Sequence, residues 1–336
     1  MRTAIGSNMR VVMGKASDAS ARLLSVIIPA RNAEEVIADL VHRVLGQRVK
    51  GVTVEVVVVD DGSTDSTAER ARRAGARVVS IDDEQSGGGN PAAARNRGAA
   101  ASGGDPLVFL DADCTPRPGW LAALLQGHSA GAEAVGGSLG LPEGLSLTAR
   151  CDYYCGWYHV HPRRPAGVVG QHPPGNLSVR REAFSRTSGF HERQPVAYAH
   201  EELRWQSELQ RAGGRILFVP GAIVDHHNRP GLGNLLRRNY RWGYSALEAK
   251  SGIAAVRYAW LYRHPRLLVL AGWPLSFAAG FYIIATWLRF RYWEPAILFP
   301  VVMAARVAYA AGMTSGGIRW LRSRGDDSAY RRPRWE

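Results

Sequence analysis

Cysteine and lysine are scarce in this sequence of 336 residues, and both shortages limit the classes of protein to which it can belong. The three cysteines, Cys114, Cys151 and Cys155, are too few and too poorly spaced for a disulfide framework or a zinc knuckle, so we expect a reducing, cytosolic setting. All but three of the 42 basic residues are arginines, and against 29 acidic residues they give a formal net charge of +13. This excess predicts an anionic neighbour, although charge alone does not choose among phosphorylated small molecules, acidic lipid headgroups and nucleic acid.

A secretion signal and two nucleotide-binding motifs are also missing. The first twenty residues hold no apolar run ahead of a cleavage site, so we expect no signal peptide and interpret residues 1–21 as a flexible arm. The segment after the first apolar run, residues 29–35, is not a Gly-x-Gly-x-x-Gly, and the glycines at 87–89 are not followed by Gly-Lys-Ser/Thr. Dinucleotide binding of the usual kind and P-loop chemistry are therefore disfavoured.

Short β-branched runs alternate with amphipathic stretches over the first third of the chain. Strands are predicted at 23–28, 54–59, 77–81 and 107–110, with helices between them at 34–45, 64–74 and 91–101. Such alternation predicts an α/β fold, with a mostly parallel sheet and helices on both faces.

Two long apolar runs follow near the C-terminus. Residues 267–288 carry no charge and are long enough to cross a bilayer core of ~30 Å. Residues 295–318 form a weaker run that contains Arg306, and a basic tail follows. The pattern predicts a soluble head with a C-terminal membrane hairpin, and the alternative is a pair of buried helices in a soluble domain.

Carboxylates follow two of the predicted strands. Asp60 and Asp61 end the second strand, at the edge where open α/β sheets bind ligands, although Asp-Gly-Ser is also a common turn and helix cap. Asp111 and Asp113 follow the fourth strand, where two carboxylates at i and i+2 can share a hard divalent cation that also contacts a diphosphate. The strand ends therefore predict a nucleotide and metal pocket.

At this point the sequence resembles family 2 glycosyltransferases with the GT-A fold. The resemblance rests on Ser-Val-Ile-Ile-Pro-Ala-Arg-Asn at 25–32, Val-Val-Asp-Asp-Gly-Ser-Thr-Asp at 58–65, Ala-Arg-Asn-Arg-Gly at 94–98, Leu-Asp-Ala-Asp at 110–113, Gly-Asn-Leu-Ser-Val-Arg-Arg at 175–181, His-Glu-Glu-Leu at 200–203 and Arg-Asn-Tyr-Arg-Trp at 238–242. These blocks cover residues 23 to 242 in the family's order. They say much less about the sugar or the acceptor.

The resemblance implies a donor site at the strand ends. Asp61 would hold the nucleotide base, with Pro29, Ala30, Arg31 and Glu34 in the same pocket. Arg95 would lie near the diphosphate. Asp111 and Asp113 would hold Mg²⁺ or Mn²⁺, with His226 as a candidate third contact, and the alternative for His226 is a surface or capping histidine.

The resemblance also implies a base and an acceptor floor. Glu202 aligns with the general base, and the neighbouring Glu201 leaves that assignment open by one residue; a solvated acidic turn is the alternative. The family usually has Asp at this position. Arg238 and Arg241 would neutralise the leaving diphosphate and Trp242 would stack on a sugar, although the same residues can form a basic stripe that meets anionic lipid.

Together these observations predict a metal-dependent, inverting glycosyltransferase on the cytosolic face of the cytoplasmic membrane. Its partners would be a UDP- or GDP-sugar donor and a lipid, lipid-linked or polysaccharide acceptor, and not nucleic acid. The expected parts are an arm at 1–21, a GT-A domain at 22–250, membrane-associated helices at 251–320 and a basic cytosolic tail at 321–336. The alternatives are a processive polysaccharide synthase, for which two apolar runs are few, and a catalytically silent, anion-binding membrane scaffold.

Overall fold

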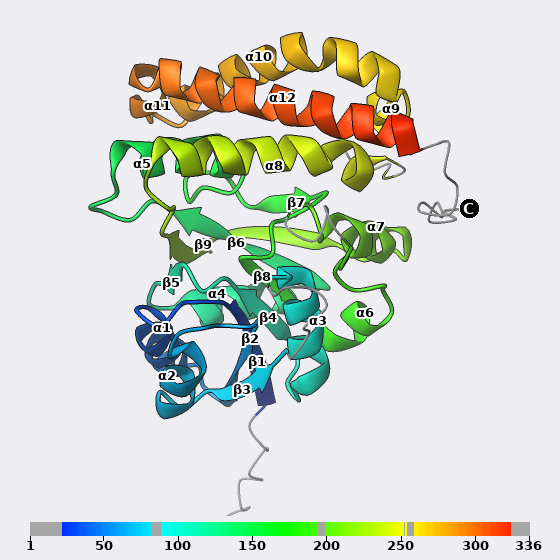
Figure 1. Ribbon diagram of the computed structural model, residues 1–336. Helices are drawn as coiled ribbons and strands as arrows, with labels where there is room; N and C mark the ends of the chain where they lie inside the picture. The colour runs from blue at the N-terminus through cyan, green and yellow to red at the C-terminus, as the bar shows by residue number, and fades with distance from the viewer. Residues whose placement is uncertain (1–21, 82–88, 194–198, 252, 254–258, 324–336) are drawn as a thin grey trace, which may run out of the picture.

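The computed structural model describes residues 22–81, 89–193, 199–251, 253 and 259–323 (Figure 1). The expected N-terminal arm at 1–21, two of the three glycines at 87–89 and most of the basic tail at 321–336 lie outside the described residues.

The first half of the sheet is parallel, as predicted. Strands β1 (Arg22–Ala30), β2 (Val52–Asp60), β3 (Arg77–Ser80) and β4 (Leu107–Leu110) pair in the order β3-β2-β1-β4, and α1 (Ile37–Leu45), α2 (Thr67–Arg73) and α3 (Pro91–Ala101) connect them. Helix α1 begins three residues later than the sequence predicts, because residues 33–36 form a turn in which the Val36 amide donates to Ala33 O.

The second half of the sheet is mixed, which the sequence did not predict. The order continues β4-β8-β6-β9-β5, with β7 also paired to β9. Strands β8 (Asn176–Val179), β5 (Cys114–Pro116) and β7 (Gly167–Val169) run antiparallel to their neighbours, whereas β6 (Ala134–Gly140) and β9 (Ile216–His226) pair in parallel. The helices of this half are α4 (Trp120–Ser129), α5 (Leu147–Trp157), α6 (Arg181–Ser185) and α7 (Leu203–Arg211).

Apolar side chains cover both faces of the sheet. Leu24, Val26 and Ile28 of β1 point to one core, while Ile27 between them joins the other. This alternation, together with the near-continuous apolar runs of β1 and β2, is what a parallel sheet buried on both faces requires. The two cores fix the strand ends from which the candidate site projects.

A stack of helices lies over one edge of this α/β unit (Figure 1). Helix α8 (Leu232–Lys250) lies nearest the sheet, α12 (Phe299–Ser323) runs along it, and α10 (Pro265–Arg289) forms the outer layer; the short α9 (Ala259–Tyr262) and α11 (Glu294–Ile297) flank α10. Helices α10 and α12 coincide with the two apolar runs and pack against each other as a helical hairpin.

Glycines bring α8 and α12 into backbone contact. A Cβ at Gly243 would overlap Tyr309 O, and one at Gly312 or Gly316 would overlap the carbonyls of Tyr240 and Tyr244. Small residues at such a crossing let two helices approach closely. Gly312 and Gly316, in the second apolar run, therefore pack α12 directly against the backbone of α8.

The two apolar runs differ in kind. Among the described helices, α10 alone has the length and apolar composition to cross a bilayer. Arg306 of α12 is 8% exposed and donates to Asn239 Oδ1 on α8 at 3.1 Å, with its guanidinium over the Tyr309 ring. Its charge is thus held between helices, which explains how the second run accommodates an arginine.

Candidate active site

The ends of β1 and β2 form one wall of the site. Asp61 is 4% exposed at the end of β2, and its amide donates to Ala30 O at 2.9 Å. The loops after the two strands are joined, since Asn32 Oδ1 accepts from the Thr64 amide and Glu34 accepts from the Ser66 amide. Asp61 and Ala30 therefore lie side by side, and Glu34 holds the two loops together.

Asp111 and Asp113 follow β4, and a glycine makes room for the first of them. A Cβ at Gly175 would lie 2.6 Å from Asp111 Oδ2, and the Asp111 amide donates to Gly175 O at 3.3 Å. Because β8 runs antiparallel beside β4, the segment that begins at Gly175 borders the carboxylates directly. The sequence matched this segment to the family but did not reveal its contact with Asp111.

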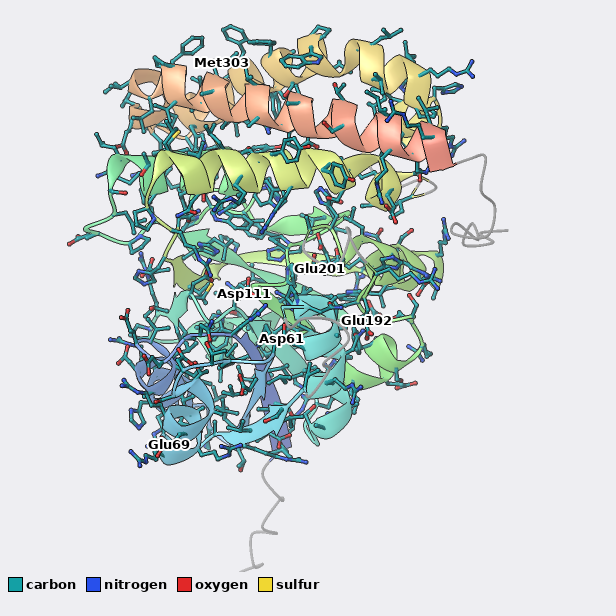
Figure 2. The ribbon with its side chains drawn as sticks, viewed as in Figure 1. Asp61, Glu69, Asp111, Glu192, Glu201 and Met303 are labelled. Carbon is teal, nitrogen blue, oxygen red and sulfur yellow. The ribbon has the colours of Figure 1, made fainter. Side chains whose placement is uncertain are left out.

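Arg95 joins the two acidic segments of the site. Its guanidinium is 4% exposed and donates to Asp111 Oδ1 at 2.6 Å and to Glu201 Oε1 at 2.7 Å. The three residues come from α3, the end of β4 and the turn before α7. Figure 2 shows Asp61, Asp111 and Glu201 in the same central region, on the sheet side of α8. The resemblance implies a place for Arg95 near the donor diphosphate, and in the structure its guanidinium pairs with the carboxylates of Asp111 and Glu201.

The two glutamates before α7 are buried and differ in their partners. Glu201 accepts a hydrogen bond from Arg95. Glu202 is 8% exposed and accepts no side-chain hydrogen bond from the residues that the structure describes. Burial, and then the neighbouring Glu201, raise the pKa of Glu202 to about 8. Burial also raises the pKa of Glu201, against the attraction of Arg95. A carboxyl group with a pKa near neutral is suited to proton transfer.

Asp113 and His226 face each other at the edge of the sheet. Their Oδ1 and Nε2 atoms are 3.6 Å apart, because β5 pairs with the end of β9. The Cys114 sulfur completes a group whose ligand atoms all lie within 4.8 Å of one another. Burial raises the pKa of the Cys114 thiol well above its usual value. Among the described residues, this group holds Asp113 but not Asp111, whose carboxylate pairs with Arg95. A carboxylate and an imidazole fit Mn²⁺ or Mg²⁺, and the buried thiol adds no ligand for a hard cation.

The basic motif of α8 separates into a half-buried and an exposed arginine. Arg238 donates to Asp152 Oδ2 at 2.6 Å and lies over the Trp242 ring, 4.3 Å from its centroid. Arg241 is exposed. Arg238 is thus engaged by a carboxylate of α5, and Arg241 is the arginine of this motif that remains open to a ligand.

Arg204 and Glu208 form an ion pair one turn apart on α7, with 3.2 Å between Nε and Oε1. Sequence reasoning missed Asp152 and Asn228, which contact Arg238 and His226. They carry no motif, and their only signal is position: Asn228 lies two residues after His226.

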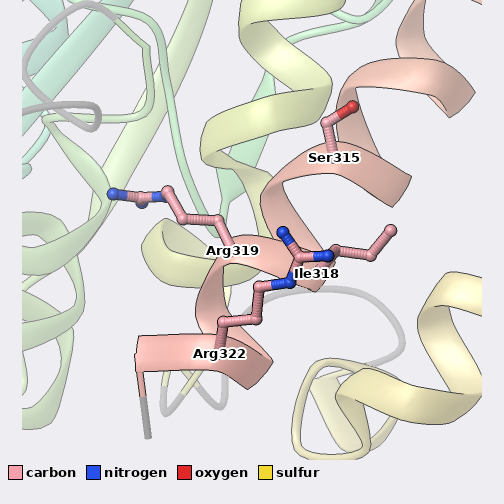
Figure 3. Close-up of a pocket in the computed structure, with 4 residues that line it drawn as sticks. All are labelled: Ser315, Ile318, Arg319 and Arg322. Atoms are coloured by element: carbon pink, nitrogen blue, oxygen red, sulfur yellow. The ribbon is translucent and has the colours of Figure 1, made fainter. Parts of the chain in front are cut away.

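A shallow pocket lies away from these carboxylates, at the C-terminal end of α12 (Figure 3). Its lining residues are Ser315, Ile318, Arg319 and Arg322. Arg319 pairs with Glu248 of α8 at 2.7 Å, so this pocket belongs to the helical stack.

Comparisons with known proteins agree with this geometry. A family model described as Glycosyl transferase family 2 matches residues 25–185, and one described as Glycosyl transferase family group 2 matches residues 117–313. Glycosyltransferase AglE of Haloferax volcanii is 31% identical over 232 residues, which span 67% of this chain and 73% of AglE. The 4,4'-diaponeurosporenoate glycosyltransferase of Staphylococcus aureus is 48% identical over 60 residues, 18% of this chain and 15% of that enzyme.

A solved structure shares the fold. Mannosyltransferase PcManGT of Pyrobaculum calidifontis, in complex with GDP-Man and Mn²⁺, matches 91% of this chain and 87% of its own with a TM-score of 0.55 and 20% identity. The mixed sheet, the matching family models and the AglE relative lead to one conclusion: the chain belongs to glycosyltransferase family 2 and has the GT-A fold.

Proposed function

We propose that this enzyme transfers a sugar, with inversion, from a UDP- or GDP-sugar to a lipid, lipid-linked or polysaccharide acceptor at a membrane surface. The observation that carries the proposal is the double contact of Arg95 with Asp111 and Glu201 at 2.6 and 2.7 Å. Through it, one candidate metal carboxylate, Asp111, and Glu201, the residue next to the candidate base Glu202, contact the same guanidinium. This brings the two acidic segments together, as transfer from a metal-held diphosphate to an adjacent hydroxyl requires.

In this proposal the strand ends bind the donor. Asp61 accepts hydrogen bonds from the nucleotide base, beside Pro29, Ala30 and Arg31. Asp111, Asp113 and His226 hold Mn²⁺ or Mg²⁺, which supplies positive charge against the departing diphosphate. Arg241, an exposed arginine of α8, adds a second cation for that leaving group.

The acceptor side of the site supplies the base. Glu202 takes the proton of the acceptor hydroxyl as that oxygen attacks the sugar on the face opposite the diphosphate. Its raised pKa makes its carboxylate a stronger base than an exposed glutamate. Arg95 holds Glu201 and so fixes the turn from which Glu202 projects. Trp242 provides an aromatic surface for the acceptor sugar.

The outer helices support an association with a membrane. The solvent side of α10 and α11 presents large apolar side chains: Leu270 is 78% exposed, Phe281 58%, Trp293 68% and Ile297 78%. Trp and Tyr at such a face suit the interface between headgroups and acyl chains. We propose that α10 meets the bilayer, with the catalytic head in the cytosol where nucleotide sugars are made.

The decisive experiment is a transfer assay with the purified protein. UDP- and GDP-sugars are supplied in turn with polyprenyl phosphate or a lipid-linked glycan, with Mn²⁺ and with EDTA, and products are sized by mass spectrometry. The proposal expects metal-dependent addition of one sugar with at least one donor and inverted stereochemistry at its anomeric carbon. A ladder of long products would identify a processive synthase. If no donor gives sugar transfer or metal-dependent hydrolysis, the protein is the catalytically silent scaffold.

A further inference from the structure

A row of buried polar side chains links His226 to helix α8. His226 Nδ1 lies 3.0 Å from Asn228 Oδ1, and Asn228 Nδ2 donates to Asp152 Oδ2 at 2.7 Å. Arg238 Nη1 donates to the same Asp152 oxygen at 2.6 Å. His226, Asn228 and Asp152 are each 6% exposed or less, so water does not replace these contacts.

The chemistry of Asp152 determines which groups in this row donate hydrogen bonds and which accept them. A carboxylate paired with a guanidinium only accepts hydrogen bonds, so the Asn228 group that faces Asp152 must be its NH₂. The carbonyl oxygen of Asn228 therefore faces His226. Because that oxygen is also only an acceptor, the ring nitrogen opposite it, Nδ1, must carry the proton.

The other ring nitrogen then faces the candidate metal site with its lone pair free. His226 Nε2 lies 3.6 Å from Asp113 Oδ1. A histidine that ligates a metal through Nε2 commonly donates its Nδ1–H to an oxygen, which fixes both the tautomer and the ring orientation. The row supplies this arrangement before any metal binds.

Aromatic rings enclose the same row. The Trp157 ring centroid is 5.0 Å from that of His226, and the Arg238 guanidinium lies 5.0 Å above Trp157. Asp152 Oδ1 and Arg238 Nε are buried without a hydrogen-bond partner among the described residues. A buried ion pair with unmet hydrogen bonds is a poor source of stability, which favours a role in orientation.

We propose that Asn228 and Asp152 are positioning residues that hold His226 in its Nδ1-protonated tautomer and so present Nε2 to the divalent cation. The inference rests on the proposed function, because it takes His226 as a metal contact. The orientation of His226 would then depend on Asp152 of α5 and Arg238 of α8, the two helices that also carry Trp157 and Trp242.

The first experiment measures the tautomer in the wild-type chain. Ring ¹⁵N NMR is recorded without metal, at a pH where His226 is neutral, and its signals are identified by their loss in His226→Gln. The proposal expects a protonated Nδ1 and an unprotonated Nε2. A protonated Nε2 in the wild-type protein would overturn it.

The second experiment measures Mn²⁺ affinity by electron paramagnetic resonance, without donor. Asn228→Leu should weaken Mn²⁺ binding roughly 10- to 100-fold, the usual cost of losing an outer-shell partner. Arg150→Gln is the matched control, because it removes an ion pair of α5 with Glu294 that lies outside the row. It should leave Mn²⁺ affinity unchanged, and thermal unfolding without metal compares the stability of the two variants.

The outcomes separate this inference from the proposed function. Equal Mn²⁺ affinity in Asn228→Leu and the wild type, or an equal loss in Arg150→Gln, would refute the positioning role and leave the metal site intact. A wild-type protein that binds neither Mn²⁺ nor Mg²⁺ would refute the proposed metal site and, with it, the presentation of Nε2 to a cation.

Discussion

The Asp pair, Asp111 and Asp113, and the Glu pair, Glu201 and Glu202, have the same functional group in opposite surroundings. The side chains of the Asp pair are 28% and 45% exposed at the end of a strand, whereas the Glu pair is at most 8% exposed before α7. Burial raises the pKa of both glutamates. Environment alone thus suits one pair to hold a cation and the other to move a proton.

Arg95 makes this contrast sharper. It contacts one member of each pair and leaves Asp113 and Glu202 as the two carboxylates that it does not bond. Asp113 and Glu202 are therefore the two carboxylates that remain available to contact a metal or a substrate. Four tests follow, in order of decreasing expected effect.

Removing a carboxylate of the Asp pair should have the largest effect. Asp113→Asn should abolish sugar transfer and make nucleotide binding insensitive to Mn²⁺, because an uncharged amide is a weak ligand for a hard cation. Initial rates and calorimetry measure both effects. Asp39→Asn, on the exposed surface of α1, is the control. Full wild-type turnover in excess EDTA would contradict the role of the Asp pair.

Within the Glu pair, the two members should respond differently. Glu202→Gln should bind donor almost normally and lose transfer by roughly 10²-fold or more, the scale of a positioned base. Glu201→Gln should instead lower the melting temperature, because it weakens the contact with the buried Arg95. If Glu201→Gln loses transfer at normal stability while Glu202→Gln keeps it, the base is Glu201.

The pH dependence should report the raised pKa of Glu202. Below about pH 8 the acid form dominates and cannot accept a proton, so kcat/KM should rise about tenfold per pH unit up to that point and then level off. The folded state keeps a proton that the unfolded chain releases near its usual pKa of 4.5, so this group lowers the free energy of unfolding as pH rises from about 4.5 to 8. Both trends should flatten in Glu202→Gln, and a kcat/KM that is already constant from pH 5 would contradict the assignment.

The smallest effect concerns the space beside the Asp pair. Gly175→Ala should displace Asp111, cost about 1–3 kcal/mol of stability and weaken Mn²⁺ binding, because the new Cβ would lie 2.6 Å from the carboxylate. Gly167→Ala is the control, since nothing lies within 4 Å of a Cβ there. Equal Mn²⁺ affinity in the two variants would show that Asp111 needs no such room.

Local pattern predicted the parallel half of the fold and the carboxylates at its strand ends. The β-branched runs of β1 and β2 and the position of Asp61 and Asp111 at strand ends are encoded within a few residues. The antiparallel strands β5, β7 and β8 were not predicted, because they are three or four residues long and their partners are distant in the chain. The bridge from Arg95 to Glu201 spans 106 residues, and no periodicity carries that information.

The helical stack also sets a length scale for the acceptor. Helix axes usually pack about 8–10 Å apart, and closer where glycines bring two backbones into contact, so the axis of α10 lies at most about 20 Å from that of α8 across α12. Backbone contacts at Gly243, Gly312 and Gly316 hold α12 against α8, so the distance between these two helices cannot shrink. If α10 meets a bilayer as proposed, an acceptor anchored there would have to extend its hydroxyl past two helices to reach Glu202. The enzyme would then exclude acceptors with short headgroups.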